Sequence, residues 1–145
     1  MRKTLPRFLY GFLSASSEPI NMRLPWQPSD RDGMFKMNYS VLDAERDNLI
    51  FWAHTNKGER VMDCEFGLDA HRYLFSPTEL MIDNLTNNAR EQLRKYFSHL
   101  MIEEISIITS DDDRTLDKNT VKFRLRAIPK FDKNSVIEIE EVIST

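Results

Sequence analysis

Residues 121 to 127 read Val-Lys-Phe-Arg-Leu-Arg-Ala, and this stretch decides the fold. Its apolar side chains occupy every second position, as they do in a β-strand with one face buried and the other exposed. The buried face would carry Val121, Phe123 and Leu125, while three cations, Lys122, Arg124 and Arg126, would line the opposite face. The stretch therefore predicts an antiparallel sheet that is covered on one side only.

Two further runs have the same alternation. Residues 101 to 109 form one of them, and Ile137 and Ile139 alternate with Glu138 and Glu140 in the other. In an antiparallel pair, the acids of the last run would lie opposite the cations of residues 121 to 127. The three runs predict a small three-stranded antiparallel sheet with a largely self-neutralised open face.

Helical patterns occupy the middle of the chain. We expect a first helix from Ser40 to about His54 and a second from Ser76 to about residue 98, where Ser76, Pro77 and Glu79 match an N-cap, a first-turn proline and a capping box. The second helix has an apolar stripe of Met81, Leu85, Ala89 and Leu93. On the first helix, we expect Glu45, Arg46, Asp47 and Asn48 to cover much of the polar surface. The predicted fold is α+β, with two main helices packed on the sheet.

The first 39 residues differ in composition from the rest. They contain four of the six prolines, which argues against long helices or strands. They also carry large apolar side chains that need a surface to cover, among them Phe8, Tyr10, Phe12 and Trp26. We therefore divide the chain into an extended N-terminal assembly arm, residues 1–39, and a domain, residues 40–145. An arm that folds back over its own domain stays open as an alternative.

Composition excludes several classes of function. The chain has 145 residues and a net charge of −3, so no overall field attracts it to nucleic acid. Its apolar run after the first seven residues is too short for a membrane span, and we expect neither a signal peptide nor a membrane partner. One cysteine and three histidines leave little from which to build a metal site, and no cofactor motif is present. We expect no bound metal or cofactor.

Candidate catalytic residues have simpler interpretations. Glu59, Asp63, Glu65 and Asp69 lie close in sequence and could supply the two carboxylates of a glycosidase. Charged residues are common in this chain, so we expect solvated or salt-bridged loop residues, with Glu59 and Arg60 fixing the loop. Cys64 with His54 or His71 could form a thiol and base, but no local motif supports it, and we expect a buried, inert thiol. No catalytic residues are assigned.

Three motifs carry a resemblance to a known family. They are Thr55-Asn56-Lys57-Gly58-Glu59-Arg60-Val61-Met62, then Phe66-Gly67, then Leu74-Phe75-Ser76-Pro77. In this spacing they resemble the baseplate wedge proteins of contractile-tailed phages, a family also labelled lysozyme-like, and their type VI secretion relatives. The resemblance covers residues 40 to 143. It departs from the family pattern at Cys64, where a proline is usual, and at residues 98 to 101, where a Glu-Pro-Arg tripeptide is expected.

The resemblance implies a non-enzymatic wedge subunit in the tail baseplate of a virion, assembled in the host cytoplasm. Its implied partners are other wedge proteins and the tail sheath protein, with the tail tube or hub as a further candidate. Gly58, Glu59, Arg60, Phe66 and Gly67 would form the family's motif loop.

An exposed strand edge could accept a sheath strand and so initiate sheath assembly. Candidates for that edge are Val121, Phe123, Leu125, Ile137 and Ile139. A tail-associated peptidoglycan hydrolase and a free regulatory adaptor of similar fold stay open as alternatives, as does a related injection device in place of a phage tail.

Overall fold

The structure is a computed structural model that describes residues 18–73, 76–109, 117 and 120–144. The chain divides into two compact units between Asp47 and Asn48, within helix α1 (Val41–His54). Our division into an arm and a domain at residues 39 and 40 stays a prediction. Of the arm residues, Phe8, Tyr10 and Phe12 lie outside the described part of the chain.

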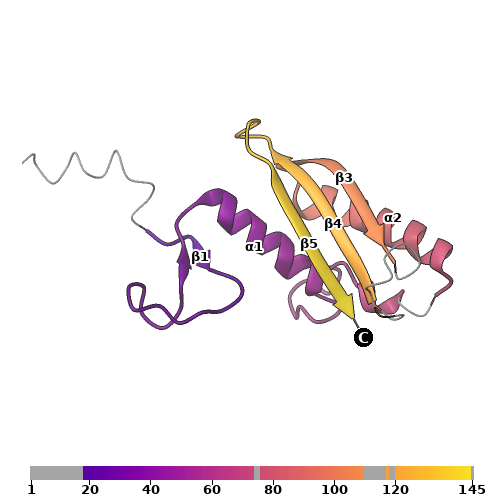
Figure 1. Cartoon of the computed structure of the whole chain (residues 1–145), viewed down its shortest axis with the longest axis horizontal. Coiled ribbons are helices and arrows are strands. Elements are labelled where there is room, and N and C mark those ends of the chain that lie inside the picture. The colour runs from indigo at the N-terminus through magenta and orange to yellow at the C-terminus, as the bar shows by residue number, and fades with distance from the viewer. Residues whose placement is uncertain (1–17, 74–75, 110–116, 118–119, 145) are drawn as a thin grey trace, which may run out of the picture. The chain divides into compact units, whose positions relative to one another are not determined.

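The second unit contains the expected sheet. Strands β3 (Leu100–Ile108), β4 (Thr120–Pro129) and β5 (Ile137–Ser144) pair antiparallel, with β4 in the centre (Figure 1). Helix α2 (Thr78–Tyr96) and the short 3-10 helix η2 (Ala70–Arg72) precede them. The predicted α+β class, with two helices and a three-stranded antiparallel sheet, is confirmed.

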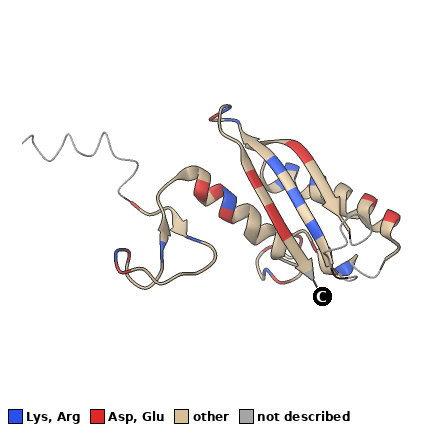
Figure 2. Ribbon diagram, in the orientation of Figure 1, with Lys and Arg blue, Asp and Glu red and all other residues tan. Residues whose placement is uncertain are grey.

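Acids of β5 lie opposite cations of β4, as expected. Arg124 lies opposite Glu140, and Arg126 lies opposite Glu138. Figure 2 shows the resulting basic bands on β4 beside acidic bands on β5. The Arg124 guanidinium donates to Glu140 Oε2 through Nε at 3.0 Å and Nη2 at 2.7 Å, and Lys122 pairs with the same carboxylate. Partly exposed pairs of this kind stabilise little, but they favour one register over its neighbours.

The core of the second unit lies between the helices and the opposite face of the sheet. Trp52 is fully buried, and its ring meets Phe97 and Phe123 nearly edge-on, with centroids 6.1 and 6.0 Å away. On α2, Met81, Leu85, Ala89 and Leu93 are buried as expected, together with Gln92. Each large aromatic group removes 150–250 Å² from water, so this cluster supplies a major part of the stabilisation.

The ends of two elements differ from expectation. Helix α2 begins at Thr78, its N-cap is Pro77, and no side chain caps it, so the predicted Ser76 cap is wrong. The extended backbone of Pro77, with φ −53° and ψ 137°, places Ser76 one residue too early to reach the first turn. In β3, the pairing register shifts between Ile102 and Glu104, which marks a β-bulge that alternation did not predict.

The first unit joins a short two-stranded sheet to the start of α1. Strands β1 (Asn21–Met22) and β2 (Met37–Asn38) pair antiparallel. Asp47 is buried at 7% exposure, which corrects our placement of this residue on the polar surface. Its carboxylate accepts the partly buried Leu24 backbone N–H at 2.9 Å and a bond from the buried Asn38 amide, so it replaces water as the acceptor for both donors.

Within the described ranges, no helix has the length and apolar character needed to cross a membrane. The same residues contain no group of three or more acidic, histidine or cysteine side chains placed to hold a metal ion.

Candidate assembly interface

Of the two strands that the sequence suggested as an edge, one is paired on both sides and the other is paired on one side only. β4 pairs with β3 and β5, so Val121, Phe123 and Leu125 cannot belong to an edge, and this part of the prediction is wrong. Their side chains are at most 4% exposed and fill the core. Alternation identified the buried face correctly but carries no information on strand order, because central and edge strands of a one-sided sheet alternate alike.

β5 keeps one open edge. Its buried side chains, Ile137 and Ile139, face the core, and β4 pairs with only one of its sides. Among the residues that the structure describes, no backbone hydrogen bond joins the other side of β5 to a further element. An open edge presents N–H and C=O groups that another strand can use. Val142, half exposed, and the acids Glu138 and Glu140 lie on the open face beside this edge.

The motif loop after α1 is fixed by backbone and side-chain bonds. Gly58 adopts a positive φ of 93°, and its N–H donates to the Cys64 carbonyl at 2.8 Å. The Glu59 carboxylate accepts the Asn56 backbone N–H at 2.8 Å and the Asn56 amide at 3.0 Å. These bonds lower the pKa of Glu59, the backbone N–H contributing most. Glu59 therefore stays ionised and acts as a brace within the loop.

An aromatic stack anchors the far side of the loop. The Arg60 guanidinium lies 4.6 Å from the centre of the Phe66 ring, and Phe66 meets Tyr96 of α2 edge-on at 5.1 Å. The Tyr96 hydroxyl donates to Asp63 at 2.8 Å, which ties the loop to α2 a second time. Cation–π and edge-to-face contacts at such partly buried sites contribute about 0.5–1.5 kcal/mol each.

Gly67 completes the loop at a position where only glycine fits. Its φ is 122°, and a Cβ there would lie 2.3 Å from the Thr55 carbonyl oxygen. The next two residues then bond back to the end of α1, Leu68 N to Trp52 O at 3.2 Å and Asp69 N to Thr55 O at 3.3 Å. The motif residues thus form one rigid platform that rests against both helices of this unit.

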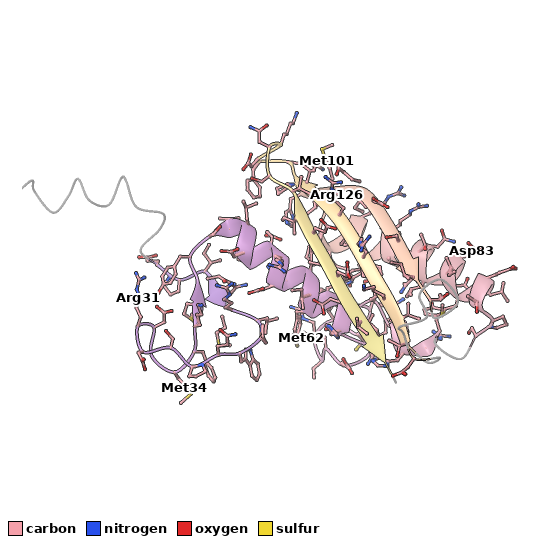
Figure 3. All side chains as sticks on the ribbon, in the orientation of Figure 1. Arg31, Met34, Met62, Asp83, Met101 and Arg126 are labelled. Atoms are coloured by element: carbon pink, nitrogen blue, oxygen red, sulfur yellow. The ribbon has the colours of Figure 1, made fainter. Side chains whose placement is uncertain are left out.

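The platform presents apolar groups to solvent. Val61 and Met62 at its tip are 89% and 95% exposed, and Met62 is labelled in Figure 3. Phe51, His54, Thr55, Glu59 and Arg60 line a shallow groove of about 260 Å³ beside them. Cys64 is exposed, so the expected buried thiol is wrong, because this residue lies in a loop whose residues 58 to 62, 64 and 65 are all exposed. Exposed apolar tips on a fixed loop are typical of contact surfaces between proteins.

Trp26, the one described arm contact from the sequence, lies in the first unit. It is 65% exposed and tilts against Phe35, with 6.0 Å between ring centroids. Exposed Met34 lies one residue before Phe35 and is labelled in Figure 3. Long-range partners such as Asp47 with Leu24 and Asp63 with Tyr96 were missed, since no local sequence pattern signals them.

Comparison with known proteins supports a shared fold. No family model matches the chain, and no curated protein is similar in sequence. A Geobacter sulfurreducens protein provisionally described as a tail lysozyme superposes with a TM-score of 0.59 and 15% identity, over 72% of this chain and 91% of that one. A chain of the anti-feeding prophage baseplate superposes with a TM-score of 0.60 and 17% identity, over 75% of this chain and 83% of that one. This chain therefore has the fold of a protein that is found in a baseplate.

Proposed function

We propose that this protein is a structural subunit of a contractile tail baseplate, where it joins wedge neighbours around the tail tube. The observation that carries the proposal is the fold shared with a chain of the anti-feeding prophage baseplate. The open edge of β5, the fixed motif loop and the exposed Trp26 supply the surfaces that such a role needs.

The proposed mechanism is positional and needs no covalent chemistry. The helices hold the sheet, β5 offers its free backbone groups, and a strand of the sheath protein adds to them as a fourth strand. The motif loop, through Val61 and Met62, and the N-terminal arm bind wedge neighbours. Sheath assembly then starts from a template whose register is fixed by the ion pairs between β4 and β5.

Two proline variants test the β5 edge. Along an antiparallel strand, successive N–H groups point to opposite edges of the strand. One of the two variants Glu141→Pro and Val142→Pro therefore removes an N–H from the open edge of β5, and the other removes an N–H that faces β4. The variant that keeps its bonds to β4 should fold, as measured by circular dichroism, and enter baseplates that no longer nucleate sheath. Normal sheath assembly on that folded variant would exclude the β5 edge as the template.

Cryo-EM of the assembled particle tests the wider role. We expect the chain between tail tube and sheath, with extra density continuing the sheet beyond β5. Density elsewhere in the particle, or absence of the chain from purified particles, would contradict the proposal.

A tail-associated peptidoglycan hydrolase is the second candidate, because a protein of the same fold is provisionally described as a tail lysozyme. A glycosidase needs a general acid whose pKa is raised, whereas the pKa of Glu59 is lowered by its bonds to Asn56. We therefore expect no peptidoglycan cleavage by the purified chain. Cleavage that disappears in the folded variants Glu59→Gln or Glu65→Gln would favour the hydrolase.

A further inference from the structure

The sheet has a second open edge, on β3, and its surroundings differ from those of β5. β3 pairs with β4 on one side only, and in the described part of the chain no backbone hydrogen bond joins residues 101 to 108 to any other element. Figure 1 shows β3 as the outer strand on the side opposite β5. A groove of about 330 Å³ lies beside β3, between this strand and α2.

Two cations line this groove. Arg90 and Arg94 are exposed and stand one helical turn apart on α2, on the same side of the helix. Neither forms an ion pair with another described residue. Glu103 also lines the groove, but its carboxylate already pairs with Arg126 of β4 at 3.2 Å. The groove therefore offers two guanidinium groups whose charges no acid among the described residues balances.

The groove also has an apolar floor and an interrupted strand. Leu100, Ile102 and Ile105 line it, and the last two are half-buried. The β-bulge between Ile102 and Glu104 lies beside the arginines, and regular pairing with β4 continues from Glu104 to Ile108. An added strand would thus pair with residues 104 to 108 and reach the arginines at the bulged end.

We propose that the β3 edge binds an extended, acidic segment of a partner protein. The backbone of the segment pairs with β3. The side chains that enter the groove all lie on one face of the added strand, where an apolar side chain covers Ile105 and carboxylates nearer the bulge bind Arg90 and Arg94. Guanidinium–carboxylate bonds are charge-assisted and can be bidentate, so they select the segment and fix its register. This site is separate from the β5 edge and does not depend on a baseplate role.

Charge distinguishes the two edges. Beside β5, Lys122 and Arg124 already pair with Glu140, His54 pairs with Glu141, and Glu138 adds a further acid, so an acidic strand would find little attraction there. The β3 edge carries exposed Glu104, but Arg90 and Arg94 of α2 add two cations beside it. One sheet can in this way bind two different segments without exchanging them.

A fluorescein-labelled peptide of sequence Val-Ser-Val-Ser-Glu-Ser-Glu is a suitable probe for the full chain, because its valines and glutamates fall on one face of an extended strand. We expect it to bind in a salt-sensitive manner, and to slow hydrogen exchange and shift the NMR signals of the amides in residues 104 to 108. A peptide with lysine in place of glutamate should bind this edge at least tenfold more weakly.

The decisive variant is Arg90→Glu with Arg94→Glu, which should weaken binding of the acidic peptide at least tenfold. Arg46→Glu with Lys133→Glu changes the net charge equally at two exposed cations outside the groove, and should bind as the natural chain does. The milder Arg90→Gln with Arg94→Gln serves if charge reversal prevents folding. Unchanged binding in the groove variants, signals that shift on β5 instead, or no binding at millimolar peptide would each overturn the proposal.

Discussion

Gly67 shows how a single residue sets the path of the motif loop. Its φ of 122° is outside the range that other residues adopt easily, and a Cβ would overlap the Thr55 carbonyl oxygen at 2.3 Å. We expect Gly67→Ala to lower the free energy of unfolding by about 2–3 kcal/mol, because backbone strain and backbone overlap combine. Urea denaturation followed by the fluorescence of buried Trp52 measures this.

Gly58→Ala is the matched control, since Gly58 has a φ of 93° but nothing within 4 Å of the added carbon. It should cost only the strain of a positive φ, about 1–2 kcal/mol. Equal losses in the two variants would contradict the close approach at Gly67.

Glu140 predicts a dependence of stability on pH. Hydrogen bonds from Lys122 and Arg124 lower its pKa below the ordinary value of 4.5. A carboxyl whose pKa is lower in the folded state contributes stability that is present above its ordinary pKa and is lost as the pH falls through the folded pKa. Below about pH 4.5, the Glu140→Gln variant should therefore lose less stability than the natural chain.

The experiment compares urea midpoints of both chains from pH 7 down to pH 3. Glu138→Gln is the control, because Glu138 occupies the same open face and forms no ion pair with another described residue. Parallel curves for the natural chain and Glu140→Gln would exclude the proposed linkage.

The sequence predicted well which face a residue occupies where a local periodicity of the strand or helix determines it. The opposition of Arg124 and Glu140 follows from alternation in two strands, and the apolar stripe of α2 follows from helical spacing. It failed at Asp47 and Cys64, whose burial depends on contacts with distant segments or on the path of a loop. A charged residue on a helix is usually solvated, and only the Leu24 and Asn38 donors reverse this preference.

At the scale of elements, Asp47 links the β1–β2 pair to α1. Removal of its carboxylate in Asp47→Ala leaves the buried Asn38 amide and the Leu24 N–H without this acceptor, which costs about 1–3 kcal/mol per group. We expect the segment from Asn21 to Asn38 to detach from α1, while the second unit stays folded. Limited proteolysis should then cut within this segment much faster than in the natural chain.

Asp43→Ala is the control for this change, because Asp43 is an exposed carboxylate on the same helix. Its proteolysis should match that of the natural chain. Equal protection of the segment in Asp47→Ala would show that other contacts hold it.

Strand existence could be predicted here, but strand order could not. Each strand alternates because one face is buried, and that condition is met equally at the centre and at the edge of the sheet. The order of strands depends on the loops that connect them and on pairing between distant segments. Residues of the central strand β4 were therefore wrongly included among the edge candidates, whereas those of β5 do lie on an edge strand. The β3 bulge is likewise a property of the pair and not of either sequence alone.

At the scale of the whole molecule, the two compact units suggest a division of labour. Every buried apolar side chain recorded among the described residues belongs to position 44 or beyond, whereas Ile20, Met22, Trp26 and Met34 are at least 45% exposed. Stability therefore resides in the later part of the chain. The earlier part has apolar side chains that its own described contacts leave largely exposed. A segment that binds neighbouring subunits is expected to have such side chains.

Removal of residues 1 to 39 separates these roles. We expect the shortened chain to fold, with the near-ultraviolet circular dichroism of a buried Trp52 and a cooperative urea transition, because the core residues remain. It should nevertheless fail to enter assembling baseplates, since Trp26 and its neighbours are lost. Incorporation at the natural level would contradict the proposed role of the arm in assembly. A shortened chain that fails to fold would instead favour the alternative in which the arm covers its own domain. In that case, Trp26→Ser in the full chain distinguishes a loss of binding from a loss of stability.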